Sequence, residues 1–131
     1  MIPAEDRTMA EHRNARLVRE CYNAATHGDP RAADFLADDV EWHEIGSAEP
    51  IVGKPAVLEH LAAGRDWSIH PTVHDVVASD DHAAVMVNAR AVRGRQTLEY
   101  RVAEFYDLRD GKVTKRWAFS DDTDRIADFF R

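Results

Sequence analysis

The sequence predicts an α+β domain in which helices come first and a strongly bent antiparallel sheet follows. Apolar residues recur at helical spacing in the first half of the chain, whereas after Pro71 the period changes to two, which is typical of half-buried strands. With 131 residues, 44% of them hydrophobic, the chain can build one core. No linker, repeat or low-complexity stretch divides it, so we interpret residues 1–131 as a single domain.

The first helix is predicted to begin at Thr8 and to end at Gly28. Thr8 and Glu11 fit a capping box, in which each side chain satisfies a free backbone group of the first turn. Gly28 suits the left-handed conformation that commonly ends a helix. The apolar face between these ends consists of Leu17, Val18, Cys21, Tyr22 and Ala25.

Two shorter helices and two short strands are predicted next. Asp29-Pro30 suits the N-cap and first position of a helix that ends near Asp38-Asp39. Pro55 opens a third helix, and Gly64 closes it. The strands around this helix are expected at residues 40–45 and 51–52.

The second half of the chain is predicted to form an antiparallel meander that curls around the helices. Asp110-Gly111 is a strong hairpin signal, and Asp80-Asp81 and Gly94 mark the other two turns. A short helix is expected at 124–130, with Asp121-Asp122-Thr123 as its N-cap region. The strands of the meander are expected at residues 72–79, 83–93, 96–108 and 112–120.

Composition narrows the class of protein and its partners. A net charge of −7 and a pI of about 5.4 argue against nucleic acid or an anionic membrane as the partner. No apolar run is long enough to span a bilayer, and the polar N-terminus lacks the apolar region of a secretory signal. Cys21 is the only cysteine, which excludes an internal disulfide and a multi-cysteine zinc site. We therefore expect a cytoplasmic protein.

Three local patterns resemble the nuclear transport factor 2-like superfamily, which includes ketosteroid isomerases and SnoaL-like polyketide cyclases. The similarity runs from about residue 11 to residue 130. It implies a cone-shaped fold, with three N-terminal helices packed on a strongly curved antiparallel or mixed sheet, a short C-terminal helix, and an apolar pocket. It also implies a homodimer that forms through the outer face of the sheet. The patterns are His27-Gly28-Asp29, Leu36-Ala37-Asp38-Asp39-Val40 and Asp110-Gly111-Lys112-Val113.

Glu44 is the leading candidate for a catalytic base. It ends the first predicted strand and precedes an irregular loop, and counting back from Pro50-Ile51-Val52-Gly53 it matches the catalytic aspartate of ketosteroid isomerases. In apolar surroundings such a carboxylate can remove a proton next to a carbonyl group. The alternative is a structural acid that accepts hydrogen bonds from the loop amides after Ile45. His43 is also a catalytic candidate, although strict alternation points it away from Glu44.

The oxyanion hole of the isomerases matches this chain less well. The tyrosine of that oxyanion hole corresponds to Cys21 in this chain, and Tyr22 is the next residue. The second donor of the isomerases is an acid, and its position falls near Arg101. One step along a helix turns a side chain by about 100°. Tyr22 is therefore not an automatic substitute, and an arginine cannot be a neutral donor.

Glu104 is a candidate that strand alternation alone supplies. If its row faces the pocket, Glu104 can serve as acid, base or donor with a raised pKa. If the row faces a dimer partner, Glu104 instead pairs with an arginine across the interface. The row consists of the residues that share one face of this strand, and Glu104 is the only acid among them. These residues are Leu98, Tyr100, Val102, Glu104, Tyr106 and Leu108.

Asp121 competes with Glu44 for the role of base. Trp117 and Asp121 resemble the Trp-x-x-x-Asp pattern of the SnoaL-like cyclases, in which the aspartate is the general acid and base of an aldol closure. A plain N-cap role for Asp121 is the alternative. Alternation places Val113, Trp117, Phe119 and Asp121 on one face. The isomerase alignment instead turns Arg116, Ala118 and Ser120 inward, and a β-bulge would reconcile the two.

Two classes of function remain open. The first is an isomerase or cyclase without a cofactor, which moves a proton next to a carbonyl group of a small hydrophobic substrate. The second is a non-catalytic module for ligand binding or dimerisation. Tyr22, Trp42, Trp117 and Phe119 are expected to line the pocket in either case. The seven histidines show no spacing typical of metal ligands, so we expect no metal.

Overall fold

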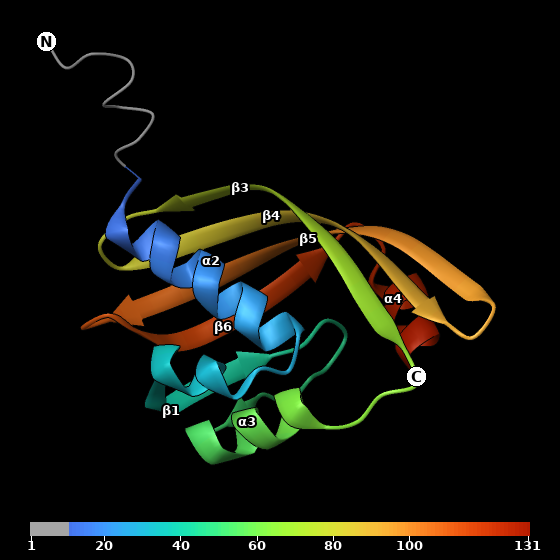
Figure 1. Ribbon diagram of the computed structural model, residues 1–131, viewed down its shortest axis with the longest axis horizontal. Coiled ribbons are helices and arrows are strands. Elements are labelled where there is room, and N and C mark those ends of the chain that lie inside the picture. Colours follow the sequence, from blue (N-terminus) through green and yellow to red (C-terminus); the bar gives the residue numbers. More distant parts are fainter. Residues whose placement is uncertain (1–10) are drawn as a thin grey trace, which may run out of the picture.

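The computed structural model describes residues 11–131, which form one six-stranded sheet with helices against its inner face (Figure 1). This architecture confirms the predicted α+β class with a mixed, curved sheet. In chain order the elements are α2 (Arg13–Thr26), the 3₁₀ helix η1 (Pro30–Phe35), β1 (Leu36–His43), β2 (Ile51–Val52), α3 (Lys54–Ala62), β3 (Ser68–Ala78), β4 (His82–Arg93), β5 (Gln96–Arg109), β6 (Lys112–Ser120) and α4 (Thr123–Phe130).

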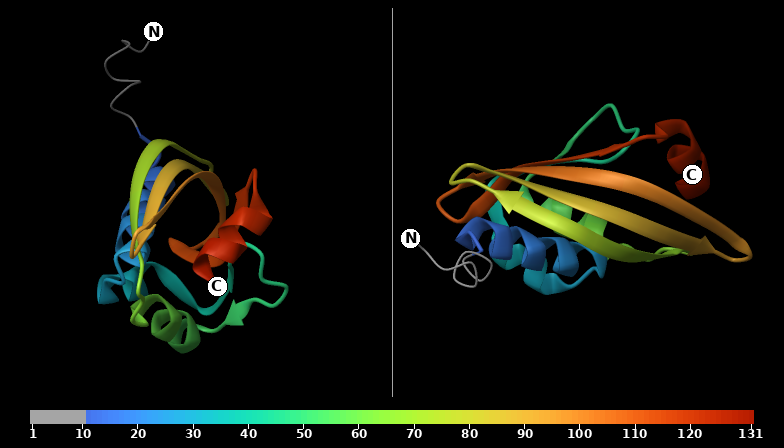
Figure 2. Two further views of the ribbon diagram at one scale, coloured as in Figure 1. Left: turned by 90° about the vertical axis from the view of Figure 1, so that its right-hand side faces the viewer. Right: turned by 90° about the horizontal axis from the view of Figure 1, so that it is seen from above.

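The strands follow the order β2-β1-β6-β5-β4-β3. Strands β3 to β6 form the predicted meander, and β1 pairs with β6 in parallel, so the first long strand lies beside the last. Figure 2 shows the resulting curvature, with α4 at the end of the sheet away from the start of α2. Because β1 and β6 are neighbours, the residues that end β1 and those in the middle of β6 meet inside the curve.

Helix α2 begins later than the capping box predicts. Its N-cap is His12, whose ring nitrogen Nδ1 accepts a hydrogen bond from the Asn14 amide at 3.1 Å. Thr8 lies outside the described residues, and Glu11 precedes the helix. The helix ends near Gly28, as expected. Gly28 adopts φ +63°, and a Cβ there would lie 3.0 Å from the carbonyl oxygen of Leu61, so this glycine lets α2 and α3 approach closely.

The boundary between η1 and β1 differs from the prediction. The helix ends at Phe35, and β1 starts at Leu36, four residues earlier than expected. Leu36 has an extended backbone and pairs with Val113 of β6. A partner 77 positions away in the sequence sets this boundary, and local propensity cannot report it. Similarly, β3 begins before Pro71, because an edge strand tolerates a proline.

A bulge in β6 decides which side chains face inward. Asp107 of β5 pairs with Lys115, but Leu108 pairs with Val113, so Thr114 is an extra residue in the ladder. As a result Val113 and Arg116 both point inward, together with Ala118, and all three are buried.

The core lies between the inner face of the sheet and the helices α2 and α3. Among the described residues no helix packs against the convex face, which carries exposed hydrophobic side chains at Val77, Met86, Phe105 and Phe119. Within residues 11–131 no helix is both long and apolar enough to cross a membrane. The largest fully buried side chains are Val18, Cys21, Leu36, Val40, Val57, Val85, Val87, Tyr106 and Val113.

Candidate functional site

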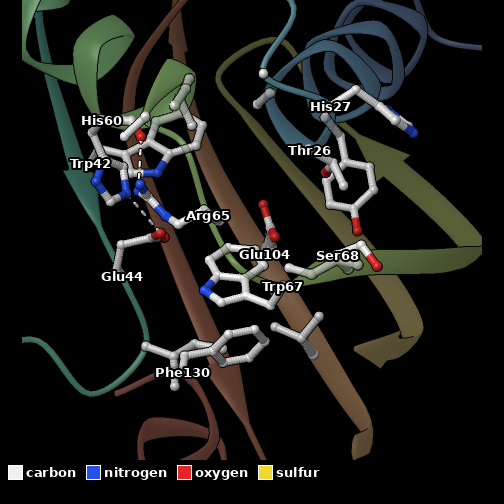
Figure 3. A pocket seen from close by; sticks show the side chains of 18 of the residues that line it. Thr26, His27, Trp42, Glu44, His60, Arg65, Trp67, Ser68, Glu104 and Phe130 are labelled. Carbon is white, nitrogen blue, oxygen red and sulfur yellow. Dashed lines mark hydrogen bonds and ion pairs between the residues drawn. The ribbon is translucent and has the colours of Figure 1, made fainter. Parts of the chain in front are cut away.

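A cavity of about 830 Å³ opens between the inner face of the sheet, the end of α2, α3 and α4 (Figure 3). Most of its wall is apolar or aromatic. Two carboxylates reach it: Glu44, the residue that follows β1, and Glu104, which lies in β5. The aromatic side chains of its wall are Tyr22, Trp42, Trp67, Tyr100 and Phe130.

Arg116 links these two carboxylates at the base of the cavity. Its Nε donates to Glu104 Oε1 at 2.9 Å, and its Nη2 lies 2.8 Å from Glu104 Oε2, which is a bidentate contact. Its Nη1 donates to Glu44 Oε1 and, at 3.2 Å, to the carbonyl oxygen of His43. The guanidinium also lies over the ring of Trp42, 4.6 Å from the centroid. Nearly all of its hydrogen-bonding capacity is therefore used within the protein.

Glu104 is the buried end of this network. It is 6% exposed, and its Oε1 also accepts a hydrogen bond from the Tyr106 hydroxyl at 2.7 Å. The row that contains Glu104 faces the cavity and the core, and its cation comes from β6 of the same chain. Of the two sequence-based alternatives, the structure agrees with the first: Glu104 lines the pocket and pairs with an arginine of its own chain.

Glu44 is the accessible end of the network, and it contacts a histidine that the sequence did not single out. His60 Nε2 lies 3.1 Å from Glu44 Oε2, as the dashed line in Figure 3 marks. The Glu44 side chain is 39% exposed, and its carboxylate contacts side chains instead of the loop amides after Ile45. His60 follows the buried Val57 by three residues on α3. That helical spacing was the one available signal for a position on the inner face.

The charges around Glu44 keep it ionised. Burial alone would raise its pKa, but the positive charge of Arg116 and the hydrogen bonds from His60 and Arg116 lower the pKa to about 2. Burial lowers the pKa of Arg116, yet the charges of Glu104 and Glu44 outweigh it and leave that pKa well above its usual value. At neutral pH Glu44 and Arg116 therefore both carry their charges.

Two tyrosines of the cavity wall remain neutral donors. Burial, followed by the charges of Glu104 and Glu44, raises the pKa of Tyr100 to about 12. Burial and the charge of Glu104 also raise the pKa of Tyr22. Both phenols thus keep their protons at neutral pH. Cys21, the residue that matches the isomerase tyrosine, is completely buried, and burial raises the pKa of its thiol to about 12.

The structure brings four of the predicted site residues together and leaves four outside the cavity. Tyr22, Trp42, Glu44 and Glu104 line it. His43 and Trp117 lie on the convex face, where their rings stack at 5.3 Å and 17°. Phe119, on the same face, is 56% exposed and meets Phe105 edge-on at 5.6 Å. The bulge at Thr114 explains these corrections for β6, because it turns Arg116 and Ala118 inward in place of their neighbours.

Asp121 also lies away from the cavity. Its carboxylate pairs with Arg101 at 2.7 Å on the surface, and the hydrogen bond from Arg101 lowers its pKa. The N-cap of α4 is the next residue, Asp122, whose Oδ1 accepts a hydrogen bond from the Arg125 amide at 3.3 Å. In the described part of the chain, no group of three or more histidine, cysteine, aspartate or glutamate residues is arranged to hold a metal ion.

Comparisons with known proteins agree with this fold. A solved LEH-like epoxide hydrolase from M. tuberculosis superposes with a TM-score of 0.72 at 20% identity, covering 85% of this chain and 86% of that one. Bal32a, from a soil-derived mobile gene cassette, gives a TM-score of 0.76 at 22% identity, with 90% and 96% covered. A provisionally assigned SnoaL-like polyketide cyclase from Jannaschia sp. CCS1 gives 0.71 at 13% identity, with 91% and 90% covered.

These identities establish a shared fold and nothing about a shared reaction. The comparison with curated proteins gives no match. A sequence model of the SnoaL-like domain, by contrast, matches residues 18–116, which span α2 to the middle of β6 and include Glu44, His60, Glu104 and Arg116. The chain therefore belongs to the SnoaL-like domain family, within the nuclear transport factor 2-like superfamily.

Proposed function

We propose that the protein is a small acid–base enzyme that needs no cofactor and acts on a small, largely hydrophobic carbonyl compound, as an isomerase or a cyclase. The observation that carries this proposal is the contact between His60 and Glu44 at the wall of an apolar cavity. A histidine held by a carboxylate is a common arrangement for moving protons, since the carboxylate fixes the tautomer and stabilises the imidazolium.

The proton acceptor in this proposal is His60, and Glu44 positions it. With a pKa of about 2, Glu44 is too weak a base to remove a proton efficiently at neutral pH. A neutral imidazole has a ring nitrogen with a free lone pair, which can accept a proton. We assign the Nε2 proton to the bond with Glu44, which leaves Nδ1 with the free lone pair.

The reaction follows from these assignments. A proton on the carbon next to the substrate carbonyl moves to His60 Nδ1, and the electron pair of that C–H bond forms an enolate on the carbonyl oxygen. A neutral phenol, Tyr22 or Tyr100, donates a hydrogen bond to that oxygen. An isomerase returns the proton to a different carbon. A cyclase instead lets the enolate carbon attack a second carbonyl of the same molecule, and the new alkoxide takes the proton.

The test measures enolisation directly, so it does not require the natural substrate. Cyclic ketones and enones are incubated with the protein in heavy water, and exchange of their α-protons is followed by NMR. We expect exchange with the wild type, a loss of about 10²–10⁴-fold in His60→Gln, and a smaller loss in Glu44→Gln. Glu59→Gln, on the exposed side of the same helix, is the matched control and should not change the rate. Equal rates in His60→Gln and the wild type would refute the role of His60.

A second candidate is a non-catalytic ligand-binding module. The observation that favours it is that nearly all hydrogen-bond donors of Arg116 are already bound to groups of the protein. The ion network is therefore a fixed part of the cavity wall. The two candidates differ in one measurement. A binding module shows saturable chemical-shift changes on titration with cyclic ketones, but no α-proton exchange above the buffer rate.

We also propose that the convex face of the sheet joins two copies of the chain. Val77, Met86, Phe105 and Phe119 are exposed there, and no helix within residues 11–131 covers them. Lys115 and Glu41, 3.7 Å apart, border this apolar face with both signs of charge, which suits a surface that pairs with itself across a two-fold axis. Light scattering after size-exclusion chromatography should give a dimer for the wild type and a monomer for Phe119→Lys. A monomeric wild type over the accessible concentrations would refute the proposal.

A further inference from the structure

An aromatic rim crosses one side of the cavity mouth. Trp67, from the segment between α3 and β3, meets Phe130 of α4 edge-on, with 4.8 Å between the ring centroids. Phe130 in turn lies 6.0 Å from Tyr100 on the inner face of the sheet. Figure 3 shows the rings of Trp67 and Phe130 next to each other, below Glu104 in that view. All three rings belong to the wall of the cavity.

One arginine holds both parts of the rim. Arg93, at the end of β4, donates through Nε to Asp66 Oδ2 at 3.0 Å, next to Trp67. Its Nη1 donates to the carbonyl oxygens of Phe129 and Arg131, at 2.8 and 2.7 Å, on either side of Phe130. A single guanidinium therefore connects β4 to the segment before β3 and to the end of α4.

The end of α4 depends on this contact for a cation. Helix α4 has eight residues, and its last turn contains no basic residue to complement the free carbonyl groups. Arg93 supplies that charge from a strand. A helix of two turns has little stability of its own, so its position depends on tertiary contacts such as this one.

A second arginine connects the rim to His60. Arg65 donates through Nη2 to the carbonyl oxygen of His60 at 3.0 Å, and its guanidinium lies 5.6 Å from the ring centroid of Trp67. The segment that Arg93 holds through Asp66 is thus the same segment that Arg65 ties to the end of α3.

We propose that Arg93 is a positioning residue that keeps Trp67 and Phe130 together and thereby determines the size of the ligand that the cavity accepts. This inference rests on the proposed function for the class of ligand, small carbonyl compounds, but not for the mechanical role of Arg93. With Arg93 in place, the contact between Trp67 and Phe130 is kept. Without it, α4 and the segment before β3 separate, and larger ligands bind better relative to smaller ones.

The first test measures hydrogen exchange in the full chain. In Arg93→Gln we expect amides of residues 123–130 and 64–67 to exchange about 10-fold faster than in the wild type, while β5 is unchanged and reports an intact fold. Arg95→Gln removes the same charge from the exposed β4–β5 turn and is the matched control, with no change expected. Asp66→Asn should accelerate amide hydrogen exchange at residues 64–67 more than in α4. Unchanged exchange in α4 of Arg93→Gln would overturn the proposal.

The second test measures ligand size. Cyclohexanone and decalone serve as monocyclic and bicyclic probes, titrated by NMR. We expect the ratio of their dissociation constants to shift toward decalone by about 5–10-fold in Arg93→Gln, with partial rescue in Arg93→Lys, whose ammonium can still bind a carbonyl oxygen. If amide hydrogen exchange becomes faster in Arg93→Gln but the ratio of the two dissociation constants does not change, Arg93 has no role in ligand selection. If no ketone exchanges its α-protons but the ratio still shifts, the catalytic proposal fails and the role of Arg93 stands.

Discussion

Glu44→Gln should lower the stability of the protein, and by an amount that depends on pH. The change removes one negative charge from the network and keeps the size of the side chain. Arg116 retains its bidentate contact with Glu104, so its own charge stays paired. The variant therefore isolates the interaction of the Glu44 charge with Arg116 and His60.

The magnitude follows from the pKa of Glu44. A fall from the ordinary 4.5 to about 2 corresponds to roughly 3 kcal/mol of free energy of unfolding. Because the side chain is 39% exposed, solvent screening reduces this to about 1–2 kcal/mol. Since the folded state has the lower pKa, this stability is complete above pH 4.5 and is lost as the pH falls toward 2.

Urea unfolding of both proteins between pH 7 and pH 3 tests this reasoning. At pH 7 the variant should be less stable by about 1–2 kcal/mol, and the difference should shrink steadily below pH 4.5. Glu59→Gln, exposed on α3, should show no such trend. A difference that stays constant between pH 6 and pH 3, or that grows as the pH falls, would refute the assignment of Glu44 as the strongly ionised member of the network.

Three further substitutions test the core of the site and its frame. Arg116→Leu leaves Glu104 buried without its cation and should cost about 3–5 kcal/mol in urea unfolding, whereas the double replacement of both residues by leucine should recover part of that loss; a double variant as unstable as the single one would contradict this. Tyr106→Phe removes the 2.7 Å hydrogen bond to Glu104 and should cost about 1–2 kcal/mol, seen as a lower Tm; an unchanged Tm would argue against that bond. Gly28→Ala places a Cβ 3.0 Å from the Leu61 carbonyl at φ +63° and should cost about 1–3 kcal/mol; a variant as stable as the wild type would mean that α3 can move away.

Much of the fold was predictable from local patterns. The last strand was expected at residues 112–120, which are its observed bounds, because Asp110-Gly111 marks its start and alternation marks its length. The position of Glu44 on the cavity wall followed from the end of a strand and the loop after it. The aromatic residues Tyr22 and Trp42 were likewise predicted to line the pocket, and they do. Each of these features is encoded within about ten neighbouring residues.

The rest of the site depends on distant pairing. Arg116 faces the cavity only because Thr114 is an extra residue in the ladder, and no composition signal marks that bulge. His60 meets Glu44 because α3 packs beside β1, which the spacing within either element does not specify. Strict alternation consequently predicts that Trp117 faces the cavity and that Arg116, the central cation of the network, does not. An unmarked bulge reverses the faces of a strand from that point onward.

The parallel pairing of β1 with β6 also restricts when the site can exist during synthesis and folding. Glu44 and Glu104 share a cation that follows them by 72 and 12 residues, so a growing chain carries both carboxylates before it carries Arg116. Until β6 docks, neither acid has Arg116 beside it. Long-range pairing of this kind is slow to form. The polar base of the cavity is therefore assembled together with the final closure of the sheet, and no fragment that ends before residue 112 can contain it.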